Sequence, residues 1–322
     1  MSAIQKQHPH YERLIATVQQ LDRPVVVAVA HPCDSSALEA ALDAHRMGLI
    51  TPLLVGPQAR IRQVAAEAGL DLGDLAIIDT EHSHASARRA VELVREGKAA
   101  ALMKGSLHTD ELMAEVVRSD TGLRTGRRLS HCFIMDVPGR DAPLIITDAA
   151  VNIAPTLEEK ADIVQNAIDL AHVLGFGEVR VAILSAVETI NYKIPSTIEA
   201  AALCKMAERG QITGALLDGP LAMDNAVDPL AAEQKGLRSP VAGRANVLVA
   251  PDLEAGNMLA KSLTFIAGAA AAGIVLGARV PIILTSRADS VPARLASCAV
   301  AALLAHHRLK AAAVLGEGAH AG

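Results

Sequence analysis

Residues 24–56 read PVVVAVAHPCDSSALEAALDAHRMGLITPLLVG and contain two apolar runs separated by an amphipathic stretch. The first run, Pro24–Ala30, is continuously apolar, which predicts a strand buried on both faces. Ser35–Met47 places its apolar residues at helical spacing behind two serines, which favours a helix that starts there. Pro52–Val55 is the second run and predicts a second strand. The stretch therefore predicts a βαβ unit with parallel strands.

The same alternation continues along the rest of the chain. Further strands are expected at Ala76–Asp79, Ala100–Lys104, Ser130–Met135, Leu144–Thr147, Val179–Ser185, Gly214–Leu217, Val247–Ala250 and Val280–Leu284. Further helices are expected at Pro57–Ala68, Ala85–Glu96, Glu158–Leu174, Ser196–Arg209, Ala255–Ala270 and Pro292–His307. These patterns predict the α/β fold class, with two α/β/α domains built on mainly parallel sheets.

Irregular stretches suggest where the two domains meet. Asp148–Thr156 carries no regular pattern and predicts one boundary, and a second is expected near Ser286. The first domain is then 1–147 plus 287–322, and the second, inserted domain is 148–286. Phe265–Ala278 is shorter than the roughly 20 residues that span a bilayer, so we expect a buried helix running into a turn. Ser196 precedes Glu199 by three residues and predicts a capping box.

Composition excludes several classes of protein. The formal net charge is −5, and the chain has no Trp, two Tyr and three Phe, so a dedicated nucleic-acid binder is not expected. The four cysteines form no CxxC pair, which indicates reduced thiols in a cytoplasmic protein rather than a disulfide or zinc scaffold. The N-terminal residues lack the apolar core of a signal peptide. We expect no nucleic-acid or membrane partner.

Small polar clusters follow several of the predicted strands. They are HPCDSS (31–36), KGSLHTD (104–110), DAAVN (148–152), DGP (218–220), PDLEAGN (251–257) and TSRADS (285–290). Parallel α/β sheets bind ligands at the carboxyl ends of their strands, so these clusters are candidate site loops. Lys104 with Ser106, and Ser286 with Arg287, each place a hydroxyl near a cation where a helix begins, which favours anion binding.

The sequence contains no P-loop, no GxGxxG following a strand and no GxSxG motif. The histidine pairs at 8/10 and 82/84 are expected on the solvated surface, with no metal bound.

Several segments resemble the phosphate acetyltransferase and phosphate butyryltransferase family. They are KGSLHTDELM, TDAAVNIAPTLEEKADIVQNAI, VAILSAVE, DGPLAMDNAV, SPVAGRANVLVAPDLEAGNMLAKSL and PIILTSRADS, and the resemblance runs from about Pro24 to His307. It implies reversible transfer of a short acyl group, acetyl to butyryl, between coenzyme A and inorganic phosphate. It further implies an active site in the cleft between two α/β domains, a homodimer, and acyl-CoA as substrate with no tightly bound cofactor.

The resemblance also implies roles for particular residues. Arg287 would hold phosphate or acyl phosphate, and Ser286 would hydrogen-bond the acyl carbonyl. Substrate-binding residues are expected among the loops that carry the resemblance, at Lys104, Ser106, Thr109, Asp252 and Asn257.

Two positions depart from the pattern of the acetyltransferases. Ala293 stands where they carry the Asp proposed as base for the coenzyme A thiol, and Met113 stands where they carry an Arg. Asp289 is therefore the candidate base, with an N-cap as its alternative role. Lys104 is a candidate for the lost positive charge, and Met113 either lines a roomier acyl pocket or packs in the core. Two other functions stay open: a catalytically weakened coenzyme A-binding regulatory protein, and a two-domain metal-dependent hydroxy-acid dehydrogenase.

Overall fold

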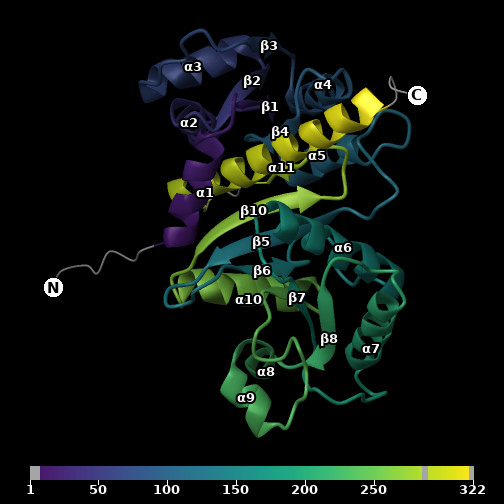
Figure 1. Cartoon of the computed structure of the whole chain (residues 1–322). Helices are drawn as coiled ribbons and strands as arrows, with labels where there is room; N and C mark the ends of the chain where they lie inside the picture. The colour runs from purple at the N-terminus through teal and green to yellow at the C-terminus, as the bar shows by residue number, and fades with distance from the viewer. Residues whose placement is uncertain (1–7, 285–288, 319–322) are drawn as a thin grey trace, which may run out of the picture. The chain divides into compact units, whose positions relative to one another are not determined.

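The computed structural model describes residues 8–284 and 289–318, with side chains described as far as residue 313. The chain folds into two compact units, and each unit contains a set of neighbouring strands (Figure 1). The first unit consists of Glu12–Arg127 and Ala272–Gly322, and the second unit consists of Met1–Tyr11 and Arg128–Ala271.

The first unit contains a mainly parallel sheet in the order β3-β2-β1-β4-β11-β10. Its strands are β1 (Val25–Ala30), β2 (Ile50–Gly56), β3 (Ile77–Asp79), β4 (Ala101–Lys104), β10 (Ala270–Leu276) and β11 (Ile282–Ile283). β10 is the antiparallel member and pairs with β11 through Val275 and Ile282. Val27 in β1 pairs with both Pro52 and Ala101 and is fully buried, as expected of a strand covered on both faces.

Helices cover the sheet of the first unit. They are α2 (Ser35–Arg46), α3 (Gln58–Ala68), α4 (Ser83–Arg95), α5 (Thr109–Val116), α11 (Val291–Gly318) and most of α1 (Pro9–Gln19). The long helix α11, yellow in Figure 1, packs on α2 and on β1, β2, β4 and β11. α4 packs on β1, β2 and β4 and on α5. Leu38 and Leu102 are fully buried between these elements.

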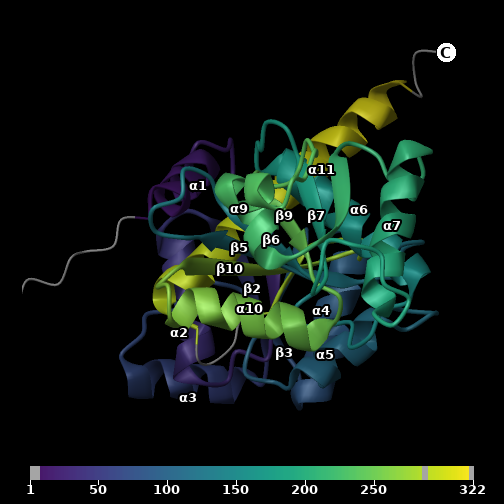
Figure 2. The ribbon, with the colours of Figure 1, turned by 90° about the horizontal axis from the view of Figure 1, so that it is seen from below.

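The second unit contains a sheet in the order β5-β6-β9-β7-β8. Its strands are β5 (Ser130–Asp136), β6 (Leu144–Thr147), β7 (Arg180–Leu184), β8 (Leu216–Leu221) and β9 (Val247–Val249), of which β5 runs antiparallel to β6. Its helices are α6 (Leu157–Val173), α7 (Pro195–Glu208), α8 (Met223–Val227), α9 (Pro229–Gln234) and α10 (Leu253–Phe265). α10 packs on β5 and β6 (Figure 2). Thr156 and Glu159 form a capping box that starts α6.

The α/β class with mainly parallel sheets is therefore confirmed. The strands predicted in the sequence fall on β1 to β9 and β11, with ends that shift by up to four residues. The predicted domain boundaries at 147/148 and 286/287 stay a prediction. Among the described residues, no helix combines the length and the apolar character that crossing a membrane requires.

One predicted helix segment was wrong. Helix α10 ends at Phe265, and Ala270–Leu276 forms strand β10 rather than a helix running into a turn. Gly268 has a φ of +71°, a left-handed conformation that favours glycine and helps end the helical stretch. The alanines favour a helix by only a fraction of about 1 kcal/mol each. Pairing of Val275 with β11 overrides that preference and buries Ile274 completely.

Two smaller predictions were also wrong. The DGP segment lies inside β8 rather than after it, because Gly219 allows β8 to approach β7: a Cβ there would lie 2.8 Å from Ile183. Ser196 is inside helix α7, which starts at Pro195, and its hydroxyl bonds to that of Ser185 at 2.8 Å. Glu199 instead pairs with Lys160 of α6, so no capping box forms.

Candidate functional site

The polar loops of the first unit meet at the carboxyl edge of its parallel strands. The loop after β1 and the loop after β4 are joined there by Ser106. Its hydroxyl donates to the His31 carbonyl at 2.8 Å and accepts from the Cys33 N–H at 3.1 Å. Its own N–H donates to the same carbonyl at 2.9 Å. Ser106, predicted to bind substrate, therefore holds these two loops together.

Gly105 brings the two loops into direct contact. Its N–H donates to the Ala30 carbonyl at 2.8 Å. A Cβ at this position would lie 2.5 Å from the His31 carbonyl oxygen and closer still to that of Ala30. Only glycine fits here, so the KGS sequence sets the separation of β1 and β4 at this edge.

Two other residues expected to bind substrate lie at the two ends of the loop after β4. Lys104 is half-buried, and its ammonium donates to the carbonyls of Gly105 and Leu107 at 3.0 and 3.2 Å. Thr109 is the exposed first residue of α5, whose N-cap is His108. Lys104, Ser106 and Thr109 thus lie between the end of β4 and the start of α5, and their binding of substrate stays a prediction.

His31 is a residue of this edge that the sequence reasoning did not single out. It follows β1 directly and has a φ of +56°, the left-handed region that a non-glycine residue rarely adopts. Such backbone conformations are concentrated at functional sites. The imidazole is half-buried, and burial lowers its pKa while Glu111 partly opposes the shift. Its place directly after a buried strand was the signal in the sequence.

The predicted catalytic residues come shortly before α11 in the sequence. Ser286 and Arg287 are outside the described residues, so their roles stay predictions. Asp289 is described and partly exposed. The helix that follows is capped by Ser290, whose hydroxyl accepts from the Ala293 N–H at 3.3 Å and whose carbonyl accepts from the Arg294 N–H. Ser290, not Asp289, therefore provides the cap of this helix.

The second unit has its own polar cluster at the corresponding edge, after β6. Asp148 is buried, and its carboxylate accepts from the backbone N–H groups of Ala150, Val151 and Asn152 at 2.9, 3.0 and 3.2 Å. The Asn152 side-chain amide also donates to it. A buried carboxylate is stable only with such donors around it.

An arginine missed in the sequence extends this cluster. Arg128 Nε donates to Asn152 Oδ1 at 2.8 Å, and its Nη1 pairs with Glu159 at 2.9 Å. The positive charge is thus linked to Asp148 through the amide of Asn152. No motif marked Arg128, since it lies outside the polar clusters that follow strands.

The PDLEAGN segment fastens the start of α10 to this cluster. Asp252 caps the helix by accepting from the Ala255 N–H at 2.8 Å. Asn257 donates its amide to the Ala149 carbonyl at 3.1 Å. Gly256 packs against the backbone of Asp148, where a Cβ would not fit. Asp252 and Asn257 thus lie together in the second unit, and their contact with substrate stays a prediction.

The second unit also buries a histidine beside Asp148. His131 lies on β5, one residue before the Cys132–Thr147 pair, and its ring meets that of Phe133 edge-on at 4.4 Å. Its Nδ1 has no hydrogen-bond partner among the described residues. Burial lowers the pKa of His131 to about 4, and the nearby Asp148 charge opposes the shift. The folded protein therefore holds this imidazole neutral at neutral pH.

We expect this histidine to make stability depend on pH. Its pKa in the unfolded chain is about 6.5, so between about pH 4 and about pH 6.5 the unfolded chain binds the extra proton. Stability is therefore lost as pH falls through this window and is fully present above it. In urea titrations, His131→Gln should reduce the slope of unfolding free energy against pH by up to about 1.4 kcal/mol per pH unit. An unchanged slope in His131→Gln would contradict this assignment.

All four cysteines are free thiols, as the sequence predicted. Burial raises the pKa of Cys33 to about 11 and those of Cys132, Cys204 and Cys298 to about 12. The protonated thiol is a poor nucleophile and a poor metal ligand. Among the described residues, no three His, Cys, Asp or Glu side chains are grouped so that they could hold a metal ion.

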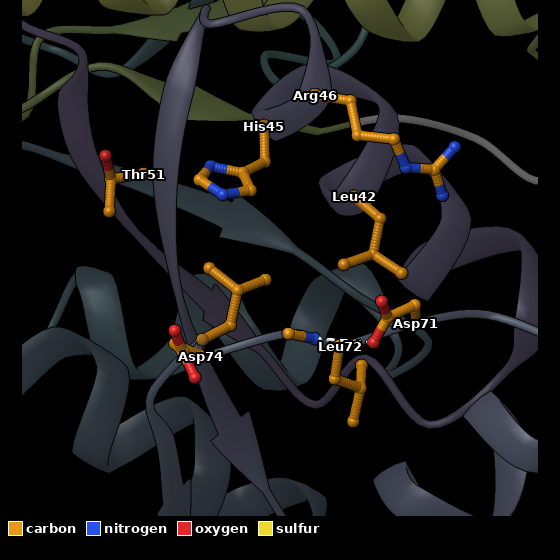
Figure 3. A pocket seen from close by; sticks show the side chains of 9 residues that line it. Leu42, His45, Arg46, Thr51, Asp71, Leu72 and Asp74 are labelled. Atoms are coloured by element: carbon orange, nitrogen blue, oxygen red, sulfur yellow. Dashed lines mark hydrogen bonds between the residues drawn. The ribbon is translucent and has the colours of Figure 1, made fainter.

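A pocket of about 490 Å³ lies elsewhere in the first unit (Figure 3). It is lined by Leu42, His45, Arg46, Thr51, Asp71, Leu72, Gly73, Asp74 and Leu75. These residues come from the end of α2, the start of β2 and the segment before β3. The pocket is therefore at the amino ends of the parallel strands, away from the loops that carry the predicted site residues.

The family model and the relatives of known name agree on one family. The model described as phosphate acetyl/butaryl transferase matches residues 83–302. The phosphate acetyltransferase of Rhizobium meliloti is 68% identical over 298 residues, which cover 92% of this chain and 94% of that protein. The phosphate butyryltransferase of Clostridium acetobutylicum is 42% identical over 282 residues, covering 88% and 94%. The crystal structure of a branched-chain phosphotransacylase from Enterococcus faecalis V583 has a TM-score of 0.77 and 30% identity, covering 88% of this chain and 99% of that one.

The fold and these similarities define an acyltransferase. The chain belongs to the phosphate acetyl/butyryl transferase family, as the sequence motifs predicted. Membership of this family favours the transferase over the dehydrogenase considered from the sequence.

Proposed function

We propose that this chain transfers a short acyl group, acetyl to butyryl, reversibly between coenzyme A and inorganic phosphate. The 68% identity to a phosphate acetyltransferase over almost the whole chain carries the proposal. Acyl-CoA and phosphate are then its substrates, and the proposal includes no tightly bound cofactor.

The proposed chemistry explains the residues of the TSR segment. Both substrates are anionic, and two unit charges 4 Å apart repel by about 4 kcal/mol at an effective dielectric constant of about 20. Arg287 would offset this repulsion with a forked pair of hydrogen bonds to phosphate. Ser286 would donate to the acyl carbonyl oxygen as negative charge develops on it. Lys104, Ser106 and Thr109 in the first unit, and Asp252 and Asn257 in the second, are the proposed substrate-binding residues.

The acyl-phosphate-consuming direction also needs a proton acceptor. A free thiol has a pKa of about 8.5 and is only a few per cent thiolate at neutral pH. Because Ala293 cannot accept a proton, Asp289 is the candidate that the sequence offers. Ser290 takes over the helix cap, which is consistent with a different role for Asp289.

The test is thiol release from acetyl-, propionyl- and butyryl-CoA, measured with and without phosphate or arsenate in the presence of EDTA. Phosphate-dependent release that EDTA does not affect would support the transferase, and the order of rates would identify the acyl group. Binding of coenzyme A without release from any of the three would favour the regulatory protein instead.

Removing the proposed phosphate ligand should slow this reaction. We expect Arg287→Ala to lower turnover at least about tenfold, which corresponds to roughly 1.4 kcal/mol of transition-state stabilisation. Arg62→Ala is a matched control, since Arg62 is an exposed arginine of α3. Equal turnover in the two variants would remove Arg287 from the mechanism.

A cytoplasmic homodimer completes the proposal. The four unpaired thiols are consistent with a reducing compartment. Met258, Phe265 and Ile266 of α10 and its C-cap are 62%, 75% and 84% exposed, an apolar surface that a second copy could cover. Light scattering behind a sizing column would give the oligomeric state directly.

A further inference from the structure

The first unit holds a hydrogen-bonded histidine that the mechanism above leaves unused. His31 Nδ1 lies 3.0 Å from the hydroxyl of Ser86. That hydroxyl also donates to the His82 carbonyl at 3.0 Å and lies 2.8 Å from the Thr80 hydroxyl. Ser86 is fully buried in α4, so the arrangement is built into the packing of the unit.

The directions of the His31–Ser86 and Thr80–Ser86 hydrogen bonds decide which nitrogen of His31 carries the proton. A serine hydroxyl has one hydrogen, and we assign it to the His82 carbonyl, which can only accept. With this assignment Ser86 Oγ accepts from both Thr80 and His31. In this assignment the imidazole carries its proton on Nδ1, and Nε2 is the unprotonated nitrogen.

The position of His31 suits a role in the reaction. It follows β1 at the carboxyl edge, and its carbonyl is bonded to the loop that contains Lys104 and Ser106. In the sheet of this unit, β4 lies between β1, which His31 follows, and β11.

We propose that His31 Nε2 accepts the thiol proton of coenzyme A, in place of the carboxylate that Ala293 lacks. This inference rests on the proposed function. As sulfur attacks the acyl carbon of the acyl phosphate, the S–H proton passes to Nε2, the C–S bond forms and the C–O bond breaks. Phosphate leaves with the electron pair, and the imidazolium then returns its proton to phosphate or solvent. In the other direction the imidazolium protonates the departing thiolate.

The electrostatic surroundings support this role. Burial and the neighbouring His82 lower the pKa of His31, so the ring is neutral and able to accept a proton at neutral pH. Glu111 on α5 acts in the opposite direction and would stabilise the imidazolium once it forms. One oxygen of Glu111 is buried without a hydrogen-bond partner among the described residues, and the other lies 3.8 Å from His84. The Lys104 ammonium, on the adjoining loop, is hydrogen-bonded to backbone carbonyls.

The test compares His31→Asn with the parent enzyme in the acyl-phosphate-consuming direction. Asparagine tolerates a positive φ, so the loop should keep its conformation, which circular dichroism checks. We expect kcat to fall about 100-fold or more with little change in KM. The remaining rate should rise with pH toward the thiol pKa of about 8.5, since only pre-formed thiolate reacts. The parent rate should be flat over the same range.

Further variants separate proton transfer from a structural effect. His31→Gly also fits the backbone, and added imidazole should restore part of its activity. Ser86→Ala should lower kcat roughly tenfold, because without the Ser86 hydroxyl the proton of His31 can move from Nδ1 to Nε2. His45→Asn, a matched change on α2 at the opposite edge of the sheet, should leave the rate unchanged.

The outcomes distinguish this inference from the proposed function. A parent protein inactive with all three acyl-CoA substrates overturns both. An active parent with a His31→Asn variant of the same pH profile, or a His31→Gly variant that imidazole does not restore, overturns the role of His31 alone. A pH-dependent loss of rate in Asp289→Asn, with no loss in His31→Asn, would identify Asp289 as the proton acceptor and overturn the role of His31.

Discussion

Gly105→Ala is expected to lower the free energy of unfolding by at least about 2 kcal/mol and to abolish most of the activity. The added methyl group would meet the carbonyl oxygens of Ala30 and His31 inside van der Waals contact. Both oxygens belong to the backbone of β1 and its loop, so no side chain can rotate away. The loops after β1 and β4 must separate, which breaks the hydrogen bond from Gly105 to Ala30 and strains those of Ser106.

The matched control is Gly126→Ala, in the same unit. A Cβ at Gly126 meets nothing within 4 Å, and its φ lies outside the left-handed region. That substitution should leave stability unchanged or raise it by up to about 1 kcal/mol, because alanine lowers the conformational entropy of the unfolded chain. Urea unfolding followed by circular dichroism measures both variants, since the chain has no tryptophan to report fluorescence. Equal unfolding free energies would show that the two loops are not held in contact at Gly105.

The positions of most strands in the sequence could be predicted, because each parallel strand is a short run buried on both faces. β1, with Val27 and Val29 fully buried, is the clearest case. β10 could not be predicted, because AAAGIVL has no β-branched residue in its first half. Its conformation is set by pairing with β11, a partner that the local sequence does not reveal.

The location of the candidate site was predictable, but the contacts of its residues were not. Polar clusters after strands must lie at the carboxyl edge once the sheet is parallel. Which clusters touch depends on strand order, so Ser106 bonding to His31, 75 positions away, left no local signal. The same holds for Asn257 and the Ala149 carbonyl. The sequence places His31 in a candidate loop, but its backbone conformation and its bond to Ser86 appear only in the folded chain.

Asp148→Ala should be the corresponding disruption in the second unit, with a loss of roughly 3 kcal/mol or more in unfolding free energy. The carboxylate is buried and satisfies three backbone N–H groups together with the Asn152 amide. Alanine removes every one of these acceptors. The backbone N–H of Asn152 would then lose its partner, and the Asn152 amide would keep only the Leu129 carbonyl, so its contact with Arg128 would loosen.

Asp228→Ala is the control that isolates burial as the cause. Asp228 caps α9 by accepting from the N–H groups of Leu230 and Ala231 at 2.7 and 3.1 Å, but it is exposed. Water can replace its carboxylate, so we expect a loss of only about 1 kcal/mol. Urea unfolding of both variants at neutral pH gives the comparison. Equal losses would mean that water reaches the N–H groups around Asp148 when its carboxylate is removed. The cluster after β6 would then be open to solvent rather than a buried support for the loop and the start of α10.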